Sequence, residues 1–372
     1  AAFSTEMSEF GRFFLPGPTE VRPEVLRALT RPLIGHRGSE MVALMERILP
    51  RLSRVFRTRR PVWVSTSSAT GLMEAAIRNC VRRRCLCLVN GAFGDRFYRI
   101  ALACGKEADR LEVPWGAAHD PDAVAEAVRG RGYDAVTVVH SETSTGVLNP
   151  VAEIAEAVRS ADPDALVLVD AVSSLAGAPV ETDAWGLDVV LTGAQKALAL
   201  PPGLAFAAAS ERALGRAAEV PDRGVYFDFL AFERSAEERQ TTNTPAVSLL
   251  YALDVQLERI EAEGLERRWA RHRAMAERTA AWAEGAAERV GVRLEVQAPP
   301  GRRSPTVTSL RCSGGWAGPE VVRRARARGY VIGGGYGAWK ETSFRIGHMG
   351  DHTLEELEGC LAVLDEILRE GP

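Results

Sequence analysis

The chain has 372 residues, of which 46% are hydrophobic and 26% are charged, and its formal net charge is -3. This length suffices for a large domain and a smaller one, and the charge balance gives no basic surface typical of nucleic-acid binding. No apolar run is long enough to span a membrane, and the first residues lack the pattern of a secretion signal, so we expect a cytoplasmic protein without membrane or nucleic-acid partners.

Short apolar runs alternate with helical patterns between residues 61 and 210. The runs are nearly continuous in Val, Leu and Ala, which is typical of parallel strands covered by helices on both faces. The region therefore predicts an α/β fold with a mainly parallel, seven-stranded sheet. The predicted strands are Val62–Ser65, Cys85–Val89, Arg110–Val113, Ala135–Val139, Leu166–Val169, Val189–Thr192 and Leu204–Ala208, and the clearest helices are Gly71–Arg83, Pro121–Val128 and Val151–Val158.

The pattern changes after about residue 250, where two long helical patterns precede short strands and a last helix. That helix is predicted to begin at Thr353, with Glu356 completing a capping box. These elements predict a smaller α+β domain. We place an N-terminal arm at 1–18, the large domain at 19–262 and the small domain at 263–372. After the change in pattern we expect helices over Leu249–Glu263 and Glu266–Val290 and strands at Val292–Val296, Thr306–Arg311, Tyr330–Ile332 and Ser343–Ile346.

Lysine is rare in this chain, because 43 of its 46 basic residues are arginines and only Lys106, Lys196 and Lys340 are lysines. Arginine can serve most surface roles of lysine, but its guanidinium does not deprotonate to a nucleophilic amine. Lys106 is expected in an exposed turn after a helix, and Lys340 in a turn before a strand. Lys196 instead follows a predicted strand among Ala and Leu residues, where partial desolvation would lower its pKa.

The six cysteines are scattered through apolar segments. Cys85 and Cys87 have the spacing of a metal-binding pair, but they lie within the apolar run CLCLV, as core cysteines do. We therefore expect buried thiols in a reducing compartment and no metal site.

Polar residues follow several of the predicted strands, and ligands gather at the carboxyl ends of the strands in such a sheet. The hydroxyl-rich run at 64–71 leads from a strand into a helix, where it could bind a phosphate or simply cap the helix. Asp170 ends a buried strand and needs a partner, which could be a metal, a ribose, a protonated heterocycle or a helix terminus. Together, Asp170 and Lys196 supply the carboxylate and the amine that pyridoxal phosphate requires.

Three further features would face the same crevice. The loop HSETSTGVLNP, 140–150, brings hydroxyl groups and a tight turn. Phe93 lies in a glycine-flanked loop, where it could stack on a flat ring or belong to the local core. Arg345 lies among apolar neighbours on a predicted strand, and its guanidinium should hold a carboxylate, either of a ligand or of the protein itself.

With these motifs in this order, the sequence resembles the class V aminotransferases, which are pyridoxal-phosphate enzymes of fold type I. The likeness runs through FLPGPTEV, PLIGHR, HSETSTG, VDAVSSLAG, TGAQKALALPPG, NTPAVSLLYAL and FRIGHMG, almost from end to end. Among these enzymes the sequence is most similar to alanine–glyoxylate and serine–glyoxylate aminotransferases and to the archaeal-type enzymes acting on aspartate or phosphoserine.

The resemblance implies roles for individual residues. It implies that Lys196 binds the cofactor and moves protons. It also implies that Asp170 is the partner of the cofactor's ring nitrogen. It also implies a homodimer in which Thr241 to Thr244 complete the partner's phosphate site, although Thr241 lacks the phenol that relatives often carry there. The remaining implied contacts are Ser68, Ala69, Thr70 and Gln195 with the cofactor phosphate, Phe93, Thr143 and Val172 with its ring, and Arg345 with the substrate carboxylate.

The resulting prediction is a ping-pong aminotransferase that moves an amino group from alanine or serine to glyoxylate or another 2-oxo acid. The nearest alternative is an aspartate or phosphoserine aminotransferase, in which His36 and Arg37 would hold a second anionic group rather than lie in a surface turn. A cysteine-desulfurase-like lyase is less favoured, because Cys312 and Cys360 do not lie on a loop that could present a nucleophile. A dehydrogenase is disfavoured because the glycine run GGGYG, 333–337, does not follow an early strand. A non-catalytic protein that binds the cofactor is the last alternative.

Overall fold

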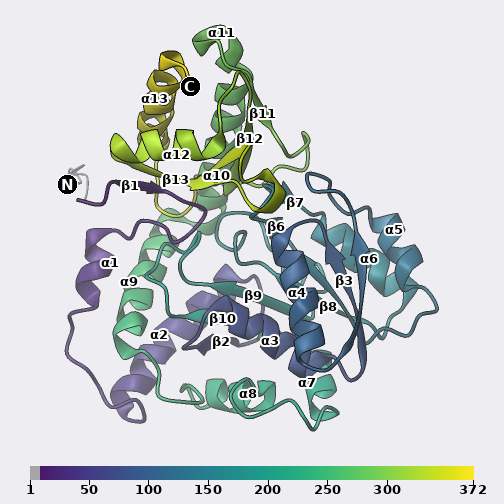
Figure 1. The fold of residues 1–372 in the computed structure, drawn as a ribbon. Helices are drawn as coiled ribbons and strands as arrows, with labels where there is room; N and C mark the ends of the chain where they lie inside the picture. The colour runs from purple at the N-terminus through teal and green to yellow at the C-terminus, as the bar shows by residue number, and fades with distance from the viewer. Residues whose placement is uncertain (1–8) are drawn as a thin grey trace.

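The computed structural model describes residues 9–372, so the first eight residues of the predicted N-terminal arm lie outside the described residues. A large α/β layer structure forms the lower part of the molecule in Figure 1, and a smaller sheet with its helices lies above it. None of the helices in residues 9–372 combines the length and apolar character that a membrane span requires.

The large sheet has seven strands in the order β2-β10-β9-β8-β5-β3-β4. All neighbouring pairs are parallel except the two made by β10, which runs antiparallel to β2 and β9. The mainly parallel α/β sheet expected from the sequence is thus confirmed. Its strands are β2 (Val62–Ser65), β3 (Arg84–Val89), β4 (Glu107–Glu112), β5 (Ala135–Val139), β8 (Leu166–Asp170), β9 (Val189–Gly193) and β10 (Ala205–Ala209).

Strand β4 begins at Glu107, three residues before the predicted start. It is an edge strand that pairs only with β3, from Arg84 opposite Glu107 onward. Its first residues are polar and partly exposed. The apolar pattern used to predict strands therefore detects only its end.

Alternate residues of each strand point to opposite faces of the sheet, and each face has its own apolar core. Val167 and Val169 of β8 belong to the core beneath α2, α5, α6 and α9, whereas Leu166 and Leu168 belong to the core beneath α3, α4, α7 and α8. Burial on both faces explains the nearly continuous apolar strands. These helices are α2 (Ser39–Val55), α3 (Ala69–Cys80), α4 (Ala92–Ala103), α5 (Pro121–Val128), α6 (Val151–Ala161), α7 (Glu211–Ala218), α8 (Phe229–Glu237) and α9 (Val247–Glu263).

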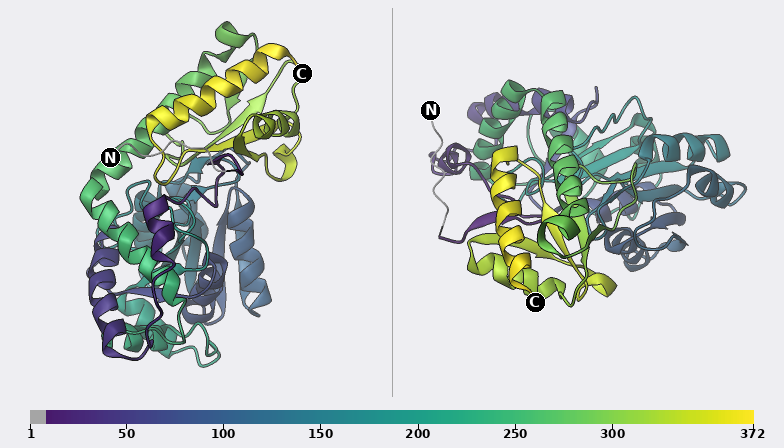
Figure 2. Two further views of the ribbon diagram at one scale, coloured as in Figure 1. Left: turned by 90° about the vertical axis from the view of Figure 1, so that its left-hand side faces the viewer. Right: turned by 90° about the horizontal axis from the view of Figure 1, so that it is seen from above.

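The small sheet has the order β1-β13-β14-β12-β11 and packs against the long helices α10 and α13 (Figure 2). Strand β1 comes from the N-terminal segment and pairs in parallel with β13, a partner more than 300 residues away in the chain. No strand is predicted from the sequence at these N-terminal residues. The elements are β1 (Arg12–Phe14), α10 (Leu265–Glu284), α11 (Ala286–Val290), β11 (Leu294–Val296), β12 (Val307–Cys312), α12 (Gly318–Ala327), β13 (Tyr330–Gly334), β14 (Ser343–Gly347) and α13 (Leu354–Glu370).

Two helical predictions can be compared directly with the structure. The helix expected over Glu266–Val290 is interrupted at Gly285, which separates α10 from α11. The capping box is confirmed, because the Thr353 side chain accepts a hydrogen bond from the Glu356 N–H and Glu356 accepts one from the Thr353 N–H. A capping box depends on two residues three positions apart, so it can be predicted from the sequence, whereas one glycine inside a long helical pattern is easily overlooked.

Candidate active site

Strands β8 and β9 bring Asp170 and Lys196 to the same edge of the sheet. Asp170 is the last residue of β8, and Lys196 follows the end of β9 by three residues. The carboxyl ends of neighbouring parallel strands lie side by side, which is where ligands bind in such sheets. The two side chains are close enough for each charge to shift the pKa of the other.

The Asp170 carboxylate is buried, with an exposed fraction of 2%. Burial raises its pKa to about 7, although the Val172 N–H, which donates to Oδ1 over 2.8 Å, acts in the opposite direction. No basic side chain among residues 9–372 forms an ion pair with Asp170. A buried carboxylate in this state favours a cation brought by a ligand, such as a protonated ring nitrogen.

Lys196 has the properties of a reactive amine. Burial lowers its pKa to about 8, and the positive charge of Arg345 acts in the same direction. Its Nζ donates a hydrogen bond to the Pro16 carbonyl. Gly17 lies so close that a Cβ there would be 2.4 Å from Nζ. Because the lowered pKa leaves part of the amine neutral near pH 8, Lys196 can attack an aldehyde.

The other two lysines lie elsewhere. Lys106 precedes β4 at the amino end of the sheet, and its side chain is only 7% exposed beside Asp222, 3.8 Å away. Lys106 follows an exposed turn at Gly105, as predicted, but packing beside Asp222 covers most of its side chain. Lys340 is exposed and lies in a turn before β14, and the turn agrees with the prediction.

The phosphate-binding loop predicted at 64–71 leads into α3, with Ser68 as the residue that precedes the helix. No side chain caps this end of α3, and the backbone N–H groups of Ala69 and Thr70 have no acceptor in the described part of the chain. Arg96 donates a hydrogen bond to the Thr70 hydroxyl over 3.3 Å. Free N–H groups at a helix start and an adjacent guanidinium together favour an anion such as a phosphate.

Gln195 and Val172 flank this edge of the sheet. A Cβ on Gly193 would lie 3.0 Å from the Gln195 Oε1 and 3.4 Å from the Ala69 Cβ, so Gln195 approaches the start of α3. Val172 follows Asp170 and holds its carboxylate through the backbone contact described above. Both residues thus lie next to the groups that the resemblance assigns to the cofactor.

A short hairpin, β6 (Ser141–Glu142) and β7 (Val147–Leu148), holds the start of α4. The Glu142 carboxylate accepts hydrogen bonds from the backbone N–H groups of Phe93 and Gly94, over 2.9 and 3.0 Å. The hairpin also carries Thr143, whose hydroxyl lies 2.5 Å from that of Ser173. Phe93 and Thr143 are thereby fixed at the same edge of the sheet as Asp170.

Arg345 reaches this edge from the small domain. It lies on β14 and donates to the Gly334 carbonyl over 2.7 Å and to the Thr143 carbonyl over 3.0 Å. The Tyr336 ring centroid lies 5.4 Å from its guanidinium carbon. No Asp or Glu among residues 9–372 forms an ion pair with Arg345, so the internal partner considered from the sequence is not found. Its charge is available for the carboxylate of a ligand.

His36, Arg37, Thr241 and Thr244 form a second cluster. Arg37 donates to the carbonyls of Thr241 and Thr242 over 2.6 and 3.3 Å, and the His36 Nε2 lies 3.4 Å from the Thr244 hydroxyl. No described hydrogen bond or ion pair joins this cluster to Lys196 or Arg345 in the same chain. The predicted site residues thus form two separate groups in one chain, one around Lys196 and one around Arg37.

Three residues at the site were not predicted individually. Glu142 lies inside the quoted motif HSETSTG, and a carboxylate three residues after a buried strand is a signal that could have identified it. Arg96 follows Phe93 by three positions, on the same face of α4, and its guanidinium carbon lies 4.7 Å from the Phe93 ring centroid. No sequence signal brings Gly17 to Lys196, because this contact spans 179 residues.

The chain is also similar to known proteins in sequence and in fold. The family described as aminotransferase class-V matches residues 94–309, more than half of the chain. An uncharacterized aminotransferase of Methanocaldococcus jannaschii is 41% identical over 370 residues, covering 96% of this chain and 92% of the relative. A serine–glyoxylate aminotransferase of Methylorubrum extorquens is 31% identical over 365 residues, covering 94% and 89%. The crystal structure of a subgroup IV aspartate aminotransferase from Thermus thermophilus has a TM-score of 0.87 at 34% identity, covering 97% of this chain and 100% of that one.

The residues present fit pyridoxal phosphate. The cofactor needs an amine for its aldehyde, a carboxylate for its ring nitrogen and donors for its phosphate. Lys196, Asp170 and the first turn of α3 provide these groups at one edge of the sheet, and the buried Asp170 has no other cationic partner in the part of the chain that the structure describes. The chain therefore belongs to the class V aminotransferases, pyridoxal-phosphate-dependent enzymes of fold type I.

Proposed function

We propose that this aminotransferase moves the amino group of alanine or serine to glyoxylate or another 2-oxo acid in a ping-pong reaction. The observation that carries the proposal is the placement of Arg345, a half-buried arginine without a carboxylate partner among residues 9–372, within electrostatic reach of the amine of Lys196. The similarity to a serine–glyoxylate aminotransferase supports this choice of substrates. A single carboxylate-binding arginine suits a small amino acid with no second charge.

We assign the cofactor contacts from the position of each residue. Pyridoxal phosphate, when bound, supplies an electron sink for the substrate Cα. Lys196 would bind its aldehyde carbon, and Asp170 would keep its ring nitrogen protonated. The other proposed contacts are Ser68, Ala69, Thr70 and Gln195 with the phosphate, Phe93 with the face of the ring, and Thr143 and Val172 with its edges.

The chain's own residues can position the substrate and move a proton. Arg345 would bind the α-carboxylate through its guanidinium and so fix the orientation of the Cα–H bond. Lys196, once its amine is free, would take the proton from the substrate Cα. It would then donate a proton to the former aldehyde carbon of the cofactor. Its pKa of about 8 leaves both protonation states accessible near neutral pH.

We further propose a homodimer in which Thr241 and Thr244 contribute to the phosphate site of the partner subunit. Just after this segment, the Ala246 N–H donates to the Thr66 hydroxyl of the phosphate-binding loop in the same chain, over 3.1 Å. Exposed apolar residues occur near it, since Val225 is 91% exposed and the neighbouring Tyr226 donates to the Thr66 carbonyl. Exposed apolar groups beside a functional site favour burial against a second subunit.

The alternative within the family is an aspartate or phosphoserine aminotransferase. The similarity to the Thermus thermophilus aspartate aminotransferase favours this reading. It would require His36 and Arg37 to bind a second anionic group, from the partner subunit if the dimer forms. In its own chain Arg37 already donates to Gln240 and two carbonyls, which leaves it fewer donors for a substrate.

The cysteine-desulfurase-like alternative is weaker. Cys360 is fully buried inside α13, and Cys312 ends β12, where burial raises its pKa to about 12. A thiol with a raised pKa is a poor nucleophile at neutral pH. Neither residue therefore has the exposure and the ionisation that such a reaction needs.

Absorbance of the protein-bound cofactor tests the proposal. The wild-type chain should take up pyridoxal phosphate and show its covalent absorbance band, and Lys196→Ala should not show this band. Alanine or serine should then convert the bound cofactor faster than aspartate or phosphoserine does, and glyoxylate should reverse the change. A chain that takes up no cofactor would overturn the proposal, and faster conversion by aspartate or phosphoserine would select the alternative.

Uptake of the cofactor without a response to any donor would indicate a non-catalytic binding protein.

Arg345→Gln should keep the absorbance band but weaken the effect of every amino donor. We expect a loss in the rate of conversion at low donor concentration of roughly 10- to 100-fold, the value of one to two charge-assisted hydrogen bonds. An unchanged donor response would remove Arg345 from the substrate site.

A further inference from the structure

The turn that carries Lys196 is held by groups from distant parts of the chain. Ala199 in this turn has a φ of +54°, a left-handed conformation that costs free energy for a residue other than glycine. Such a conformation persists only where the surroundings enforce it. The backbone N–H and the hydroxyl of Thr19 donate to the carbonyls of Gln195 and Lys196, over 3.1 and 3.2 Å.

Arg268 holds the next carbonyl. This residue of α10 is 2% exposed, and its Nη2 donates to the Ala197 carbonyl over 2.7 Å. Its Nη1 donates to Asp351 over 2.9 Å and to Glu263 over 3.0 Å. A guanidinium buried to this degree requires ionic partners, and the two carboxylates fix its orientation.

Asp351 orients a second donor to the same turn. Gln256 of α9 is fully buried and donates from its Nε2 to the Leu198 carbonyl over 2.8 Å and to Asp351 over 3.0 Å. Burial would raise the pKa of Asp351, but the charge of Arg268 and these hydrogen bonds hold it below its usual value. An ionised Asp351 thus holds the side chains of Arg268 and Gln256, and each of these donates to the turn of Lys196.

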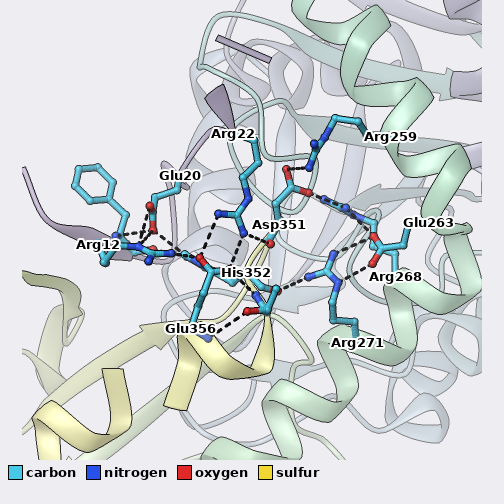
Figure 3. Close-up of polar contacts among 12 residues, drawn as sticks. Arg12, Glu20, Arg22, Arg259, Glu263, Arg268, Arg271, Asp351, His352 and Glu356 are labelled. Atoms are coloured by element: carbon cyan, nitrogen blue, oxygen red, sulfur yellow. Dashed lines mark hydrogen bonds and ion pairs between the residues drawn. The ribbon is translucent and has the colours of Figure 1, made fainter. Parts of the chain in front are cut away.

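Asp351 also connects this turn to the strand that carries Arg345. The loop that follows β14 contains Gly350, whose N–H donates to the His272 Nε2 over 2.9 Å, while the His272 Nδ1 lies 2.8 Å from the Arg268 carbonyl. A Cβ on Gly350 would lie 3.1 Å from the Ala199 Cβ, so the loop packs directly on the turn. Figure 3 shows Asp351 next to Arg259 and Arg268 of the long helices, with which its carboxylate pairs, and next to Arg22 of the N-terminal segment, which donates to its backbone carbonyl.

We propose that Arg268 and Asp351 are positioning residues, which fix the turn of Lys196 relative to β14 and so set the placement of the Lys196 amine against the Arg345 guanidinium. The proposal rests on the proposed function in assigning the reactive amine to Lys196. Neither residue touches the substrate or the cofactor in this role. Their effect acts through the Ala197 and Leu198 carbonyls, at 2.7 and 2.8 Å from the Arg268 and Gln256 donors.

The matched control is Arg271. It lies on the same helix, shares the partner Glu263 over 2.7 Å and donates to the His352 carbonyl over 2.6 Å, but it makes no described contact with residues 195–200. Arg268→Met and Arg271→Met both remove one guanidinium from the same ionic contacts. Only the first removes a donor to the turn of Lys196.

Two measurements on the full-length chain test the proposal. The first is the pH dependence of chemical labelling of the Lys196 amine in the cofactor-free protein, followed by mass spectrometry. We expect Arg268→Met to move the midpoint from about 8 toward 10.5, because the loosened turn exposes the amine, and Arg271→Met to leave it unchanged. The second is the rate of the donor half-reaction, which should fall roughly 10- to 100-fold in Arg268→Met, as expected for a misplaced reacting group, but not in Arg271→Met.

Asp351→Asn keeps the shape of the side chain and should shift both measurements in the same direction by a smaller amount. It decides the question by the same criteria if Arg268→Met does not fold. Equal effects of Arg268→Met and Arg271→Met, or a lower stability of Arg268→Met with an unchanged labelling midpoint, would overturn the proposal. The labelling experiment needs no turnover, so it separates a failure of this inference from a failure of the proposed function.

Discussion

The carboxylate of Glu142 accepts a hydrogen bond of 2.9 Å from the backbone N–H of Phe93, at the first turn of α4. The same carboxylate accepts hydrogen bonds from the N–H of Gly94 and from the N–H and hydroxyl of Ser144. Glu142 is fully buried, and its negative charge lies at the positive end of a helix. A side chain from a distant hairpin thus performs the capping that a local residue usually performs.

Glu142→Ala should therefore destabilise the start of α4 and displace Phe93. The N–H groups left without an acceptor should lower the free energy of unfolding by at least about 1–3 kcal/mol. Affinity for pyridoxal phosphate should fall as well, measured by titration of the cofactor-free protein. Glu107→Ala, at an exposed position in the edge strand β4, should change stability by less than about 0.5 kcal/mol. Equal effects of the two variants would show that the carboxylate does not hold the helix.

Gly17→Ala should prevent the normal placement of Lys196. The new Cβ would lie 2.4 Å from Nζ, closer than any atoms can approach without a shift. We expect covalent uptake of the cofactor to be slowed or lost, as measured by its absorbance band. Gly224→Ala is the control, because both glycines have a positive φ, +114° for Gly17 and +83° for Gly224. No atom lies within 4 Å of the Cβ position of Gly224. Normal uptake by Gly17→Ala would mean that Lys196 lies elsewhere in solution.

Asp170→Asn should stabilise the cofactor-free protein at neutral and higher pH. The folded-state pKa of about 7 lies above the ordinary value of 3.8, so between these values the folded chain binds more protons than the unfolded chain. Stability of the wild-type chain consequently falls as the pH rises through this window. Urea unfolding of both chains should show a difference that is largest above pH 7 and vanishes below about pH 4. A difference independent of pH would argue against burial of an ionisable carboxyl.

Asp170→Asn should also impair the reaction. Asparagine cannot keep a ring nitrogen protonated, so the rate of the donor half-reaction should fall on the order of 10²-fold or more, the loss typical of removing a preorganised electrostatic group. Stopped-flow absorbance measures this rate. A half-reaction of normal rate in Asp170→Asn would remove the carboxylate from the catalytic role proposed for it.

Lys196→Met should produce the opposite pH dependence. The folded-state pKa of about 8 lies below the ordinary value of 10.5, so between these values the unfolded chain binds more protons. Stability of the cofactor-free wild type therefore rises as the pH increases through this window, and the cost of a buried ammonium is complete below pH 8. The stabilisation by Lys196→Met should be largest below pH 8 and shrink toward pH 10.5, again measured by urea unfolding. A stabilisation that grew with pH would show that the amine is not desolvated.

Much of the fold could be predicted from local patterns. Strand β5 occupies the predicted residues Ala135–Val139, and α5 occupies the predicted Pro121–Val128, because each buries a regular apolar pattern. The start of β4 was missed since an exposed edge strand has no such pattern. The strand ends likewise indicated Asp170 and Lys196, since the position of a residue after a buried parallel strand places it at the ligand-binding edge.

Local sequence patterns suffice to predict the mainly parallel sheet, the edge that carries the reactive groups and the chemical types of those groups, because these depend on residues close together in the chain. Tertiary packing sets the pairing of β1 with β13, the covering of the Lys106 side chain, the capping of α4 by Glu142 and the attachment of Arg37 to the segment beginning at Thr241. These contacts join residues that are dozens to hundreds of positions apart, and no local periodicity encodes them. The pKa values of about 7 for Asp170 and about 8 for Lys196 belong to the same class, because desolvation depends on everything that packs around a charge.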